Sequence, residues 1–126
     1  MKPLSLLHVD DDDDIRDVAA MSLELDPTID LTSAASGEEA LDLLSAGLRP
    51  DVILLDVMMP RLDGPGTLEG LRRIAGLEDT PVIFMTARTQ GSEVQQWVRL
   101  GAVGVITKPF DPMTLAGQVR DVLSGA

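Results

Sequence analysis

The sequence contains no cysteine, so neither disulfide bonds nor thiolate metal sites can form. It also has no apolar run that approaches the length of a membrane span. The N-terminus lacks the basic segment and long apolar stretch of a secretion signal. We therefore expect no membrane insertion and a reducing, cytoplasmic setting.

Positive charge and aromatic side chains are also scarce. The 10 Lys and Arg residues are outnumbered by 21 Asp and Glu residues, which gives a formal net charge of -11. This balance argues against direct DNA binding, which depends on cationic neutralisation of phosphates, and it favours basic partners or bound cations. Tyrosine is missing and aromatics make up 2% of the chain, so base-stacking surfaces are not expected.

What the sequence does have is a regular alternation of strand and helix patterns along 126 residues, a length that fits one domain. Several strand patterns are continuously apolar, as in central strands covered on both faces. The expected strands are Leu4–Val9, Ile29–Ala34, Val52–Leu55, Pro81–Met85 and Val103–Thr107. Helix-spaced apolar residues form five sets: Ile15, Val18, Ala19 and Leu23; Ala40, Leu41 and Leu44; Leu68, Leu71 and Ile74; Val94, Trp97 and Val98 within Gly91–Leu100; and Leu115, Val119, Val122 and Leu123.

Residue types that favour helix starts agree with this alternation. Ser36 precedes a pair of glutamates, Asp63 precedes a Gly-Pro pair, and Asp111 can cap the last helix. Asp13 and Asp14 are expected to open the first helix, where negative side chains interact favourably with the positive N-terminal end.

Five strand–helix units in one domain predict an α/β fold, a doubly wound five-stranded parallel sheet with helices on both faces. A closed eight-fold barrel would need far more residues. Open sheets of this kind bind ligands outside the carboxyl ends of their strands. The residues at those ends are therefore the candidates for a functional site.

Polar residues follow four of the five expected strands. Asp10 and Asp11 come directly after the first, Asp56 ends the third, Thr86 closes the fourth and Lys108 follows the fifth. Taken singly, each has an ordinary structural interpretation, such as a turn-forming Asp or a strand-favouring Thr. Their joint occurrence at the same edge of one sheet indicates a site.

The chemistry of this set follows from its residue types. Clustered carboxylates disfavour one another's ionised forms unless a cation compensates, and hard oxygen ligands suit Mg²⁺. A carboxylate beside Mg²⁺ can attack phosphorus and form an aspartyl phosphate. An amine and a hydroxyl could then hold the phosphoryl oxygens.

With these residues in place, the sequence resembles the receiver domain of bacterial two-component response regulators, of the stand-alone, CheY-like type. The resemblance runs through LLHVDDD, DVILLDVMMPRLDG, VIFMTAR and GAVGVITKPF, and it covers essentially the whole chain. It implies the flavodoxin-like strand order 2-1-3-4-5 and a single receiver domain over residues 1–126. Few residues follow the last expected helix, so we expect no output domain.

The resemblance also implies a role for each residue of the site. Asp56 matches the phosphoacceptor, Thr86 the switch hydroxyl and Lys108 the ion-pairing lysine. Pro109 matches a proline that follows a cis peptide bond, which would direct Lys108 into the pocket. The implied metal is Mg²⁺, with Mn²⁺ as an alternative. Its implied ligands are Asp10, Asp11, Asp56 and the backbone carbonyl of Met58.

The implied activity is transfer of a phosphoryl group to Asp56 from a sensor histidine kinase, a histidine phosphotransfer protein or a small donor such as acetyl phosphate. The domain would catalyse its own phosphorylation and later dephosphorylation, as a switch rather than an enzyme that turns over a metabolite. Phosphorylation would alter the face formed by the fourth helix, fifth strand and fifth helix, which a downstream protein reads. A phosphorelay intermediate, a phosphate sink and a docking-only receiver are the alternatives.

The switch region departs from the family pattern at one position. The residue three before Lys108 is usually Tyr or Phe, but here it is Val105. Coupling from Thr86 to the surface must then use another route or be weak. We therefore expect phosphorylation to change the surface less than it does in relatives that have the aromatic residue. Met58 and Arg88, which follow the phosphoacceptor and the switch hydroxyl by two residues, are candidates for tuning the phosphate lifetime.

Three further residues have interpretations of their own. His8 lies on a central strand, and we expect a hydrogen-bonded core histidine rather than a catalytic one. Trp97 either anchors a partner from an exposed position or packs against its own domain. Asp12 is placed at the rim of the site without an assigned role.

Two rival sites fit the sequence less well. An aspartyl-nucleophile Mg²⁺ phosphatase typically has a second acid two residues after the nucleophile, where this chain has Met58. A calcium loop that begins at Asp10 would need Gly at the position of Ile15 and Glu at that of Met21.

Overall fold

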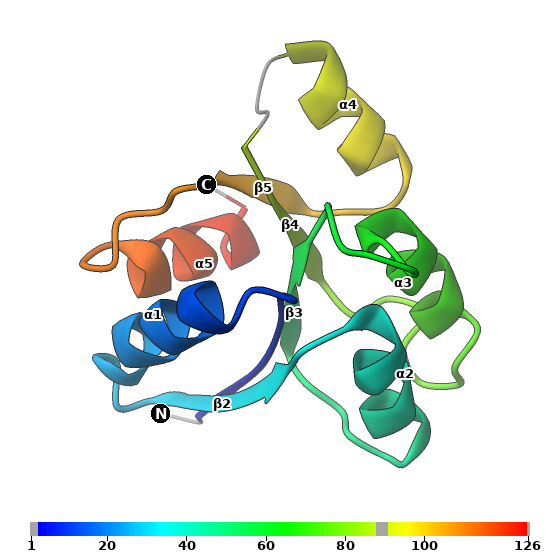
Figure 1. Cartoon of the computed structure of the whole chain (residues 1–126), viewed down its shortest axis with the longest axis horizontal. Coiled ribbons are helices and arrows are strands. Elements are labelled where there is room, and N and C mark those ends of the chain that lie inside the picture. Colours follow the sequence, from blue (N-terminus) through cyan, green and yellow to red (C-terminus); the bar gives the residue numbers. More distant parts are fainter. Residues whose placement is uncertain (1–2, 88–90, 126) are drawn as a thin grey trace.

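The computed structural model describes residues 3–87 and 91–125, in which five strands alternate with five helices (Figure 1). The strands are β1 Leu4–Val9, β2 Ile29–Ala34, β3 Val52–Asp56, β4 Val82–Thr86 and β5 Gly104–Thr107. The helices are α1 Asp13–Glu24, α2 Gly37–Ser45, α3 Gly64–Arg72, α4 Gly91–Arg99 and α5 Leu115–Leu123. Each expected strand and helix is present, with boundaries that differ by a few residues at most.

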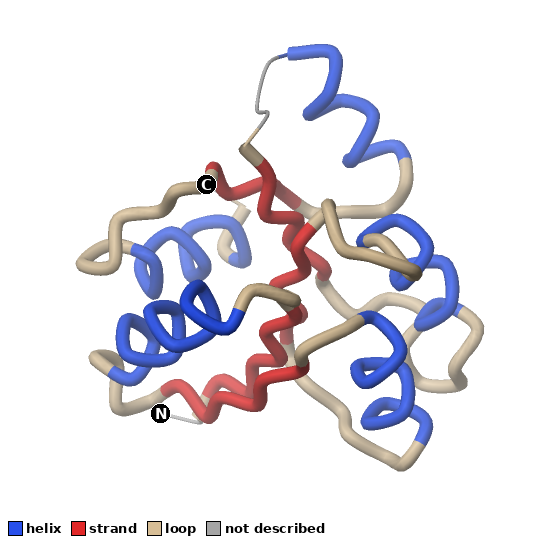
Figure 2. Tube along the Cα trace, in the orientation of Figure 1, coloured by secondary structure: helices blue, strands red, loops and turns tan. Residues whose placement is uncertain are grey.

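The strands form one parallel sheet in the order β2-β1-β3-β4-β5, which confirms the predicted fold class. The tube in Figure 2 shows this sheet as a central layer between two groups of helices. In Figure 1, α1 and α5 cover one face, α2 and α3 cover the other, and α4 lies on the side of α2 and α3 at the edge of the molecule near β5. The two-sided cover explains why every residue of β3 and β4 is buried.

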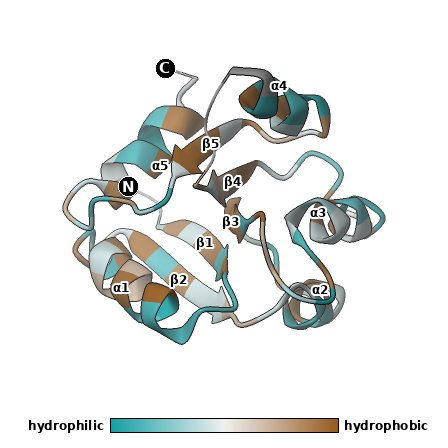
Figure 3. Ribbon diagram, turned by 45° about the horizontal axis from the view of Figure 1, so that its top comes forward, coloured by the Kyte–Doolittle hydropathy of each residue, from teal (hydrophilic) through white to brown (hydrophobic). Residues whose placement is uncertain are grey.

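Two apolar cores lie on the two faces of the sheet. Because neighbouring side chains on a strand point in opposite directions, Leu6 packs in the core under α1 and α5 while Leu7 packs in the core under α2 and α3. On β4, Ile83 and Phe84 divide between the cores in the same way. Figure 3 shows hydrophobic colour on β3, β4 and β5 and hydrophilic colour spread over the surrounding helices.

Most of the expected helix starts are confirmed. The Ser36 side chain caps α2 by accepting a hydrogen bond from the Glu39 amide, and Asp63 caps α3 through the Gly66 amide. The prediction for the last helix is wrong. Helix α5 begins at Leu115, and Asp111 lies one turn too early, where its carboxylate accepts from the Met113 amide in the preceding turn.

Three apolar residues of the expected helix faces behave differently from the prediction. Val98 of α4 is 51% exposed, although Trp97 beside it packs against the core. Val18 is 42% exposed, because Ala19, Ser22 and Leu23 form the buried face of α1 and Val18 lies at its margin. Ile74 follows the end of α3 and packs against the core from the next turn. Within residues 3–87 and 91–125, no helix has both the length and the apolar character needed to span a bilayer.

Candidate functional site

The parallel register brings the carboxyl ends of the central strands together. Val9 pairs with Leu55, so Asp10 and Asp56 follow side by side at the ends of β1 and β3. The last residue of β3 pairs with Met85, which places Thr86 next to Asp56 at the end of β4. Lys108 follows β5, whose last residue pairs with Thr86. The sheet thus collects the predicted site residues at one edge.

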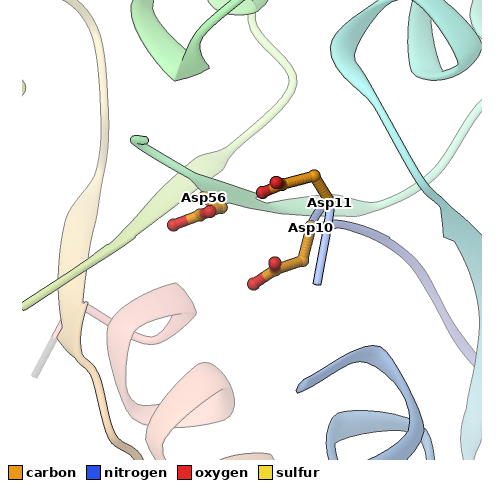
Figure 4. Close-up of side chains that lie close together, drawn as sticks. All are labelled: Asp10, Asp11 and Asp56. Atoms are coloured by element: carbon orange, nitrogen blue, oxygen red, sulfur yellow. The ribbon is translucent and has the colours of Figure 1, made fainter. Parts of the chain in front are cut away.

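Three carboxylates converge at this edge. Asp10, Asp11 and Asp56 each offer an oxygen, and these oxygens lie within 4.8 Å of one another. Figure 4 shows the three side chains pointing into one space, two from the loop after β1 and one from β3. Asp10 is fully buried and Asp56 is 4% exposed, whereas Asp11 faces solvent. The cluster is therefore buried on one side and open on the other.

Lys108 spans two of these carboxylates. Its Nζ donates to Asp10 Oδ2 at 3.0 Å and to Asp56 Oδ1 at 3.1 Å. The Lys108–Pro109 peptide bond is cis, as the resemblance implied. A single amine therefore sits between one acid of the β1 end and the acid of β3, at the position where it can also contact a group attached to Asp56.

The electrostatics of the site favour a bound cation. Burial and the neighbouring Asp10 carboxylate raise the pKa of Asp56 from 3.8 to about 6, although Lys108 opposes the shift. Burial alone would lower the pKa of Lys108, but its hydrogen bonds and charge interactions with Asp10 and Asp56 outweigh burial and raise it. One lysine thus compensates only part of the negative charge, and the excess is what a divalent cation would neutralise.

The donor set fits Mg²⁺. Three carboxylate oxygens at close range are hard ligands, and Mg²⁺ typically takes one or two carboxylates and keeps several waters. Asp11, on the open side, leaves room for those waters. The contribution of the Met58 carbonyl remains a prediction.

Backbone contacts that the sequence did not reveal hold Asp10 in place. Its Oδ1 accepts from the Asp12 amide at 2.9 Å, and its backbone carbonyl accepts from Arg16 at 2.8 Å. Asp12 is the N-cap of α1, because its carboxylate accepts from the amides of Asp14 and Ile15. An Asp followed by two more acids at a helix start is a capping signal that could have predicted this role.

A backbone contact of Gly64 likewise holds the end of β3, which carries Asp56. It begins α3, and its amide donates to the Val57 carbonyl at 2.9 Å. A Cβ at this position would lie 2.5 Å from the backbone oxygen of Asp56 and 2.8 Å from the Val57 Cα. Only glycine allows α3 to start this close to the end of β3.

A cavity of about 360 Å³ adjoins the site between β3, β4 and α4. Thr86 and Met58 line it from the ends of β4 and β3, and Gln96 and Trp97 line it from α4. The Met58 side chain is 77% exposed at the rim. Arg88, the other candidate for tuning the phosphate lifetime, lies outside the described residues.

His8 is fully buried and Trp97 is partly buried, and both carry buried ring nitrogens. Burial lowers the pKa of His8 from 6.5 to about 4, so it is neutral near pH 7. The expectation of a hydrogen-bonded histidine is wrong, since neither ring nitrogen has a hydrogen-bond partner among the described residues. Trp97 packs against its own domain, with its ring edge-on to Phe84.

Comparison with known families decides the identity of the fold. The family model described as the response regulator receiver domain matches residues 6–120. The chain belongs to this family. It is a receiver domain of two-component signalling, a phospho-accepting switch.

Several known proteins are similar to this receiver domain over nearly its whole length. Response regulator Rre1 of Synechocystis sp. is 37% identical over 123 residues, which is 98% of this chain and 53% of that protein. Transcriptional regulatory protein AfsQ1 of Streptomyces coelicolor is 40% identical over 119 residues, 94% of this chain and 51% of that protein. The chain thus spans about half the length of these curated relatives.

Solved structures agree with the family. The chemotaxis response regulator CheY4 of Vibrio cholerae superposes with a TM-score of 0.86 at 32% identity, covering 96% of this chain and 99% of that one. The receiver domain of the Francisella response regulator 1452 gives a TM-score of 0.83 at 33% identity, with coverage of 97% and 98%.

Proposed function

We propose that Asp56 accepts a phosphoryl group from the phosphohistidine of a sensor kinase or a histidine phosphotransfer protein, with Mg²⁺ bound by Asp10, Asp11 and Asp56. The observation that carries the proposal is the convergence of three carboxylates within 4.8 Å, with Lys108 donating to Asp10 and Asp56. Family membership supports the same assignment, because receiver domains are phospho-accepting switches.

The transfer is an in-line displacement at phosphorus. An oxygen of the Asp56 carboxylate attacks, the new O–P bond forms as the donor's N–P bond breaks, and the imidazole leaves with the electron pair. Because the pKa of Asp56 is about 6, its carboxylate is mostly ionised at neutral pH and available as the nucleophile. The Lys108 ammonium group stabilises the negative charge on the phosphoryl oxygens, and the Thr86 hydroxyl donates a hydrogen bond to one of them.

Bound Mg²⁺ supplies positive charge that compensates for the clustered carboxylates and the phosphoryl oxygens. The backbone carbonyl of Met58 completes the protein ligands. Hydrolysis of the aspartyl phosphate by water, which breaks the O–P bond and restores Asp56, returns the switch to its starting state. Mn²⁺, which takes the same oxygen ligands, is a second metal for the same site.

The signal passes through protein contacts on the face of α4, β5 and α5. Residues 1–126 act as one receiver domain in the cytoplasm, where a sensor kinase would present its phosphohistidine. With a net charge of -11, this domain itself does not bind DNA directly. The names of several relatives include transcriptional regulation, and that activity belongs to the longer proteins that bear those names.

Intact mass measurement after incubation with Mg²⁺ and acetyl phosphate tests the proposal. The wild type should gain one phosphoryl group, and neither Asp56→Ala nor a sample in EDTA should gain it. If no donor, including a phosphorylated kinase, yields an adduct, the domain is a docking module. Sustained release of phosphate from unrelated phosphate esters would instead indicate a phosphatase.

A further inference from the structure

Trp97 and the phosphoacceptor site share one wall of the cavity between β4 and α4. Phe84 and Thr86 lie two residues apart on β4, so their side chains project from the same face of the strand. The Trp97 ring contacts Phe84 edge-on, with centroids 5.4 Å apart and planes at 67°. Thr86 and Trp97 both line the 360 Å³ cavity. The indole therefore lies next to the wall that contains the switch hydroxyl.

The indole of Trp97 has an unsatisfied donor and an adjoining cavity. Its Nε1 is buried and has no hydrogen-bond partner among the described residues, an unfavourable arrangement for a donor. Glu93 and Gln96, whose side chains carry oxygen acceptors, line the same cavity. The ring thus has open space beside it and a reason to move into that space. Helix α4, which carries Trp97, lies at the edge of the molecule (Figure 1).

We propose that Trp97 is the positioning residue that couples the phosphoryl group on Asp56 to α4. When the Thr86 hydroxyl moves toward the phosphoryl oxygens, the cavity wall beside the indole recedes. Trp97 then shifts into the cavity, its Nε1 gains an acceptor, and α4 follows. This inference rests on the proposed function and supplies a route from Thr86 to the surface in a chain that has Val105 in β5 and no tyrosine.

Coupling of this kind is reciprocal. If the phosphorylated site favours the shifted indole, then the shifted indole favours the phosphorylated site by the same factor. Replacing Trp97 by Phe keeps an aromatic edge against Phe84 but removes the N–H donor. We expect Trp97→Phe to weaken the binding of beryllium fluoride, which mimics the phosphoryl group, by about fivefold.

Because Trp97 is the only tryptophan, its emission reports its surroundings directly. The full chain is titrated with beryllium fluoride in the presence of Mg²⁺, while ¹⁹F NMR measures binding in the same samples. In the wild type the emission should change in step with binding. Thr86→Ala keeps all three carboxylates but loses a donor to the mimic, so beryllium fluoride should bind more weakly. At saturation, as ¹⁹F NMR measures it, the emission of this variant should stay at its unbound value. Thr86→Ser, which restores a hydroxyl, should recover the change.

The outcomes separate this inference from the function on which it rests. Saturated binding without an emission change in the wild type overturns the role of Trp97 and leaves the phosphoacceptor assignment intact. An equal emission change in Thr86→Ala overturns the route through the hydroxyl. Unchanged affinity in Trp97→Phe contradicts the reciprocal coupling. Absence of both ¹⁹F-detected binding and acetyl phosphate labelling removes the proposed function itself, and the inference with it.

Discussion

At the scale of single residues, Asp56 occupies an environment that opposes its own ionisation. Burial and the Asp10 carboxylate raise its pKa to about 6, so the charged form destabilises the metal-free folded state near neutral pH. Asp56→Asn should therefore raise the free energy of unfolding in EDTA near pH 7. Each pKa unit corresponds to about 1.4 kcal/mol, and a weakened contact with Lys108 offsets part of the gain, so we expect about 1–2 kcal/mol.

The pH dependence of this difference has a definite sign. A carboxyl whose folded pKa is raised contributes stability below its unfolded pKa, and this contribution is lost as the pH rises through the folded value. The advantage of Asp56→Asn should thus be small near pH 3.8 and grow to its full size above about pH 6. Urea unfolding across this range measures it, with Asp42→Asn on the exposed surface of α2 as the control. If Asp56→Asn were less stable than wild type near pH 7, this would contradict the raised pKa of Asp56.

Met58 is the second residue whose position invites a direct test. Its side chain is exposed and lines the cavity beside Thr86, where an apolar group would hinder the approach of water to a phosphorylated Asp56. Met58→Asn supplies a polar group that can orient water, and we expect it to shorten the lifetime of the aspartyl phosphate severalfold. Loss of the labelled mass over time measures the lifetime. Met113→Asn, equally exposed but in the turn before α5, is the matched control, and equal lifetimes for all three proteins would refute the role.

At the scale of elements, the start of α3 is bound to the end of β3 through one glycine. A Cβ on Gly64 would lie 2.5 Å from the backbone oxygen of Asp56, so Gly64→Ala must displace either the helix or the strand. We expect a loss of stability of about 1–3 kcal/mol from overpacking, together with slower phosphorylation. Thermal unfolding and the rate of labelling by acetyl phosphate are the measurements.

Helix α5 provides the matched control for that substitution. A Cβ on Gly117 has nothing within 4 Å, and the residue is exposed within a helix. Gly117→Ala should therefore stabilise the protein by about 0.5–1 kcal/mol, since alanine favours the helix more than glycine does. If Gly64→Ala and Gly117→Ala had the same stability, the close approach of α3 to β3 at Gly64 would not contribute to the stability of the fold.

The elements also show how far sequence reasoning reaches. Strand patterns were readable because β3 and β4 are covered on both faces and are therefore continuously apolar. The alternation of elements predicted a parallel sheet, which puts the carboxyl ends of the strands at one edge. The strand order that makes the ends of β1 and β3 neighbours, and so brings Asp10, Asp11 and Asp56 together, was implied by the family resemblance. Two features were not predictable, namely the start of α5 without a side-chain cap and the lack of hydrogen-bond partners for His8 among the described residues. Both depend on how the chain packs against the sheet, and no periodicity encodes that. Periodicity also placed Val18 inside, although the buried face of α1 is narrower than the pattern suggested.

At the scale of the whole molecule, the charge of -11 and the carboxylate cluster link metal binding to folding. A cation that binds the folded state alone stabilises it by about 2.7 kcal/mol when its concentration is about 100 times its Kd. Mg²⁺ at such a concentration should raise the unfolding midpoint of the wild type. Because Asp11 is exposed, Asp11→Ala should leave the core intact, fold as well as wild type in EDTA and lose most of the response to Mg²⁺.

Two comparisons separate binding at the site from general screening of negative charge. NaCl at matched ionic strength weakens repulsion among surface carboxylates in both proteins alike, so it should not distinguish them. Amide hydrogen exchange adds spatial resolution, since α1 starts at Asp13, two residues after Asp11 and three after Asp10, the two proposed metal ligands at the end of β1. Withdrawal of Mg²⁺ should speed exchange there before it affects β3 or β4, whose residues are all buried. Uniform acceleration along the chain, or an equal Mg²⁺ response in Asp11→Ala, would mean that the cation acts on overall charge instead of on the three carboxylates.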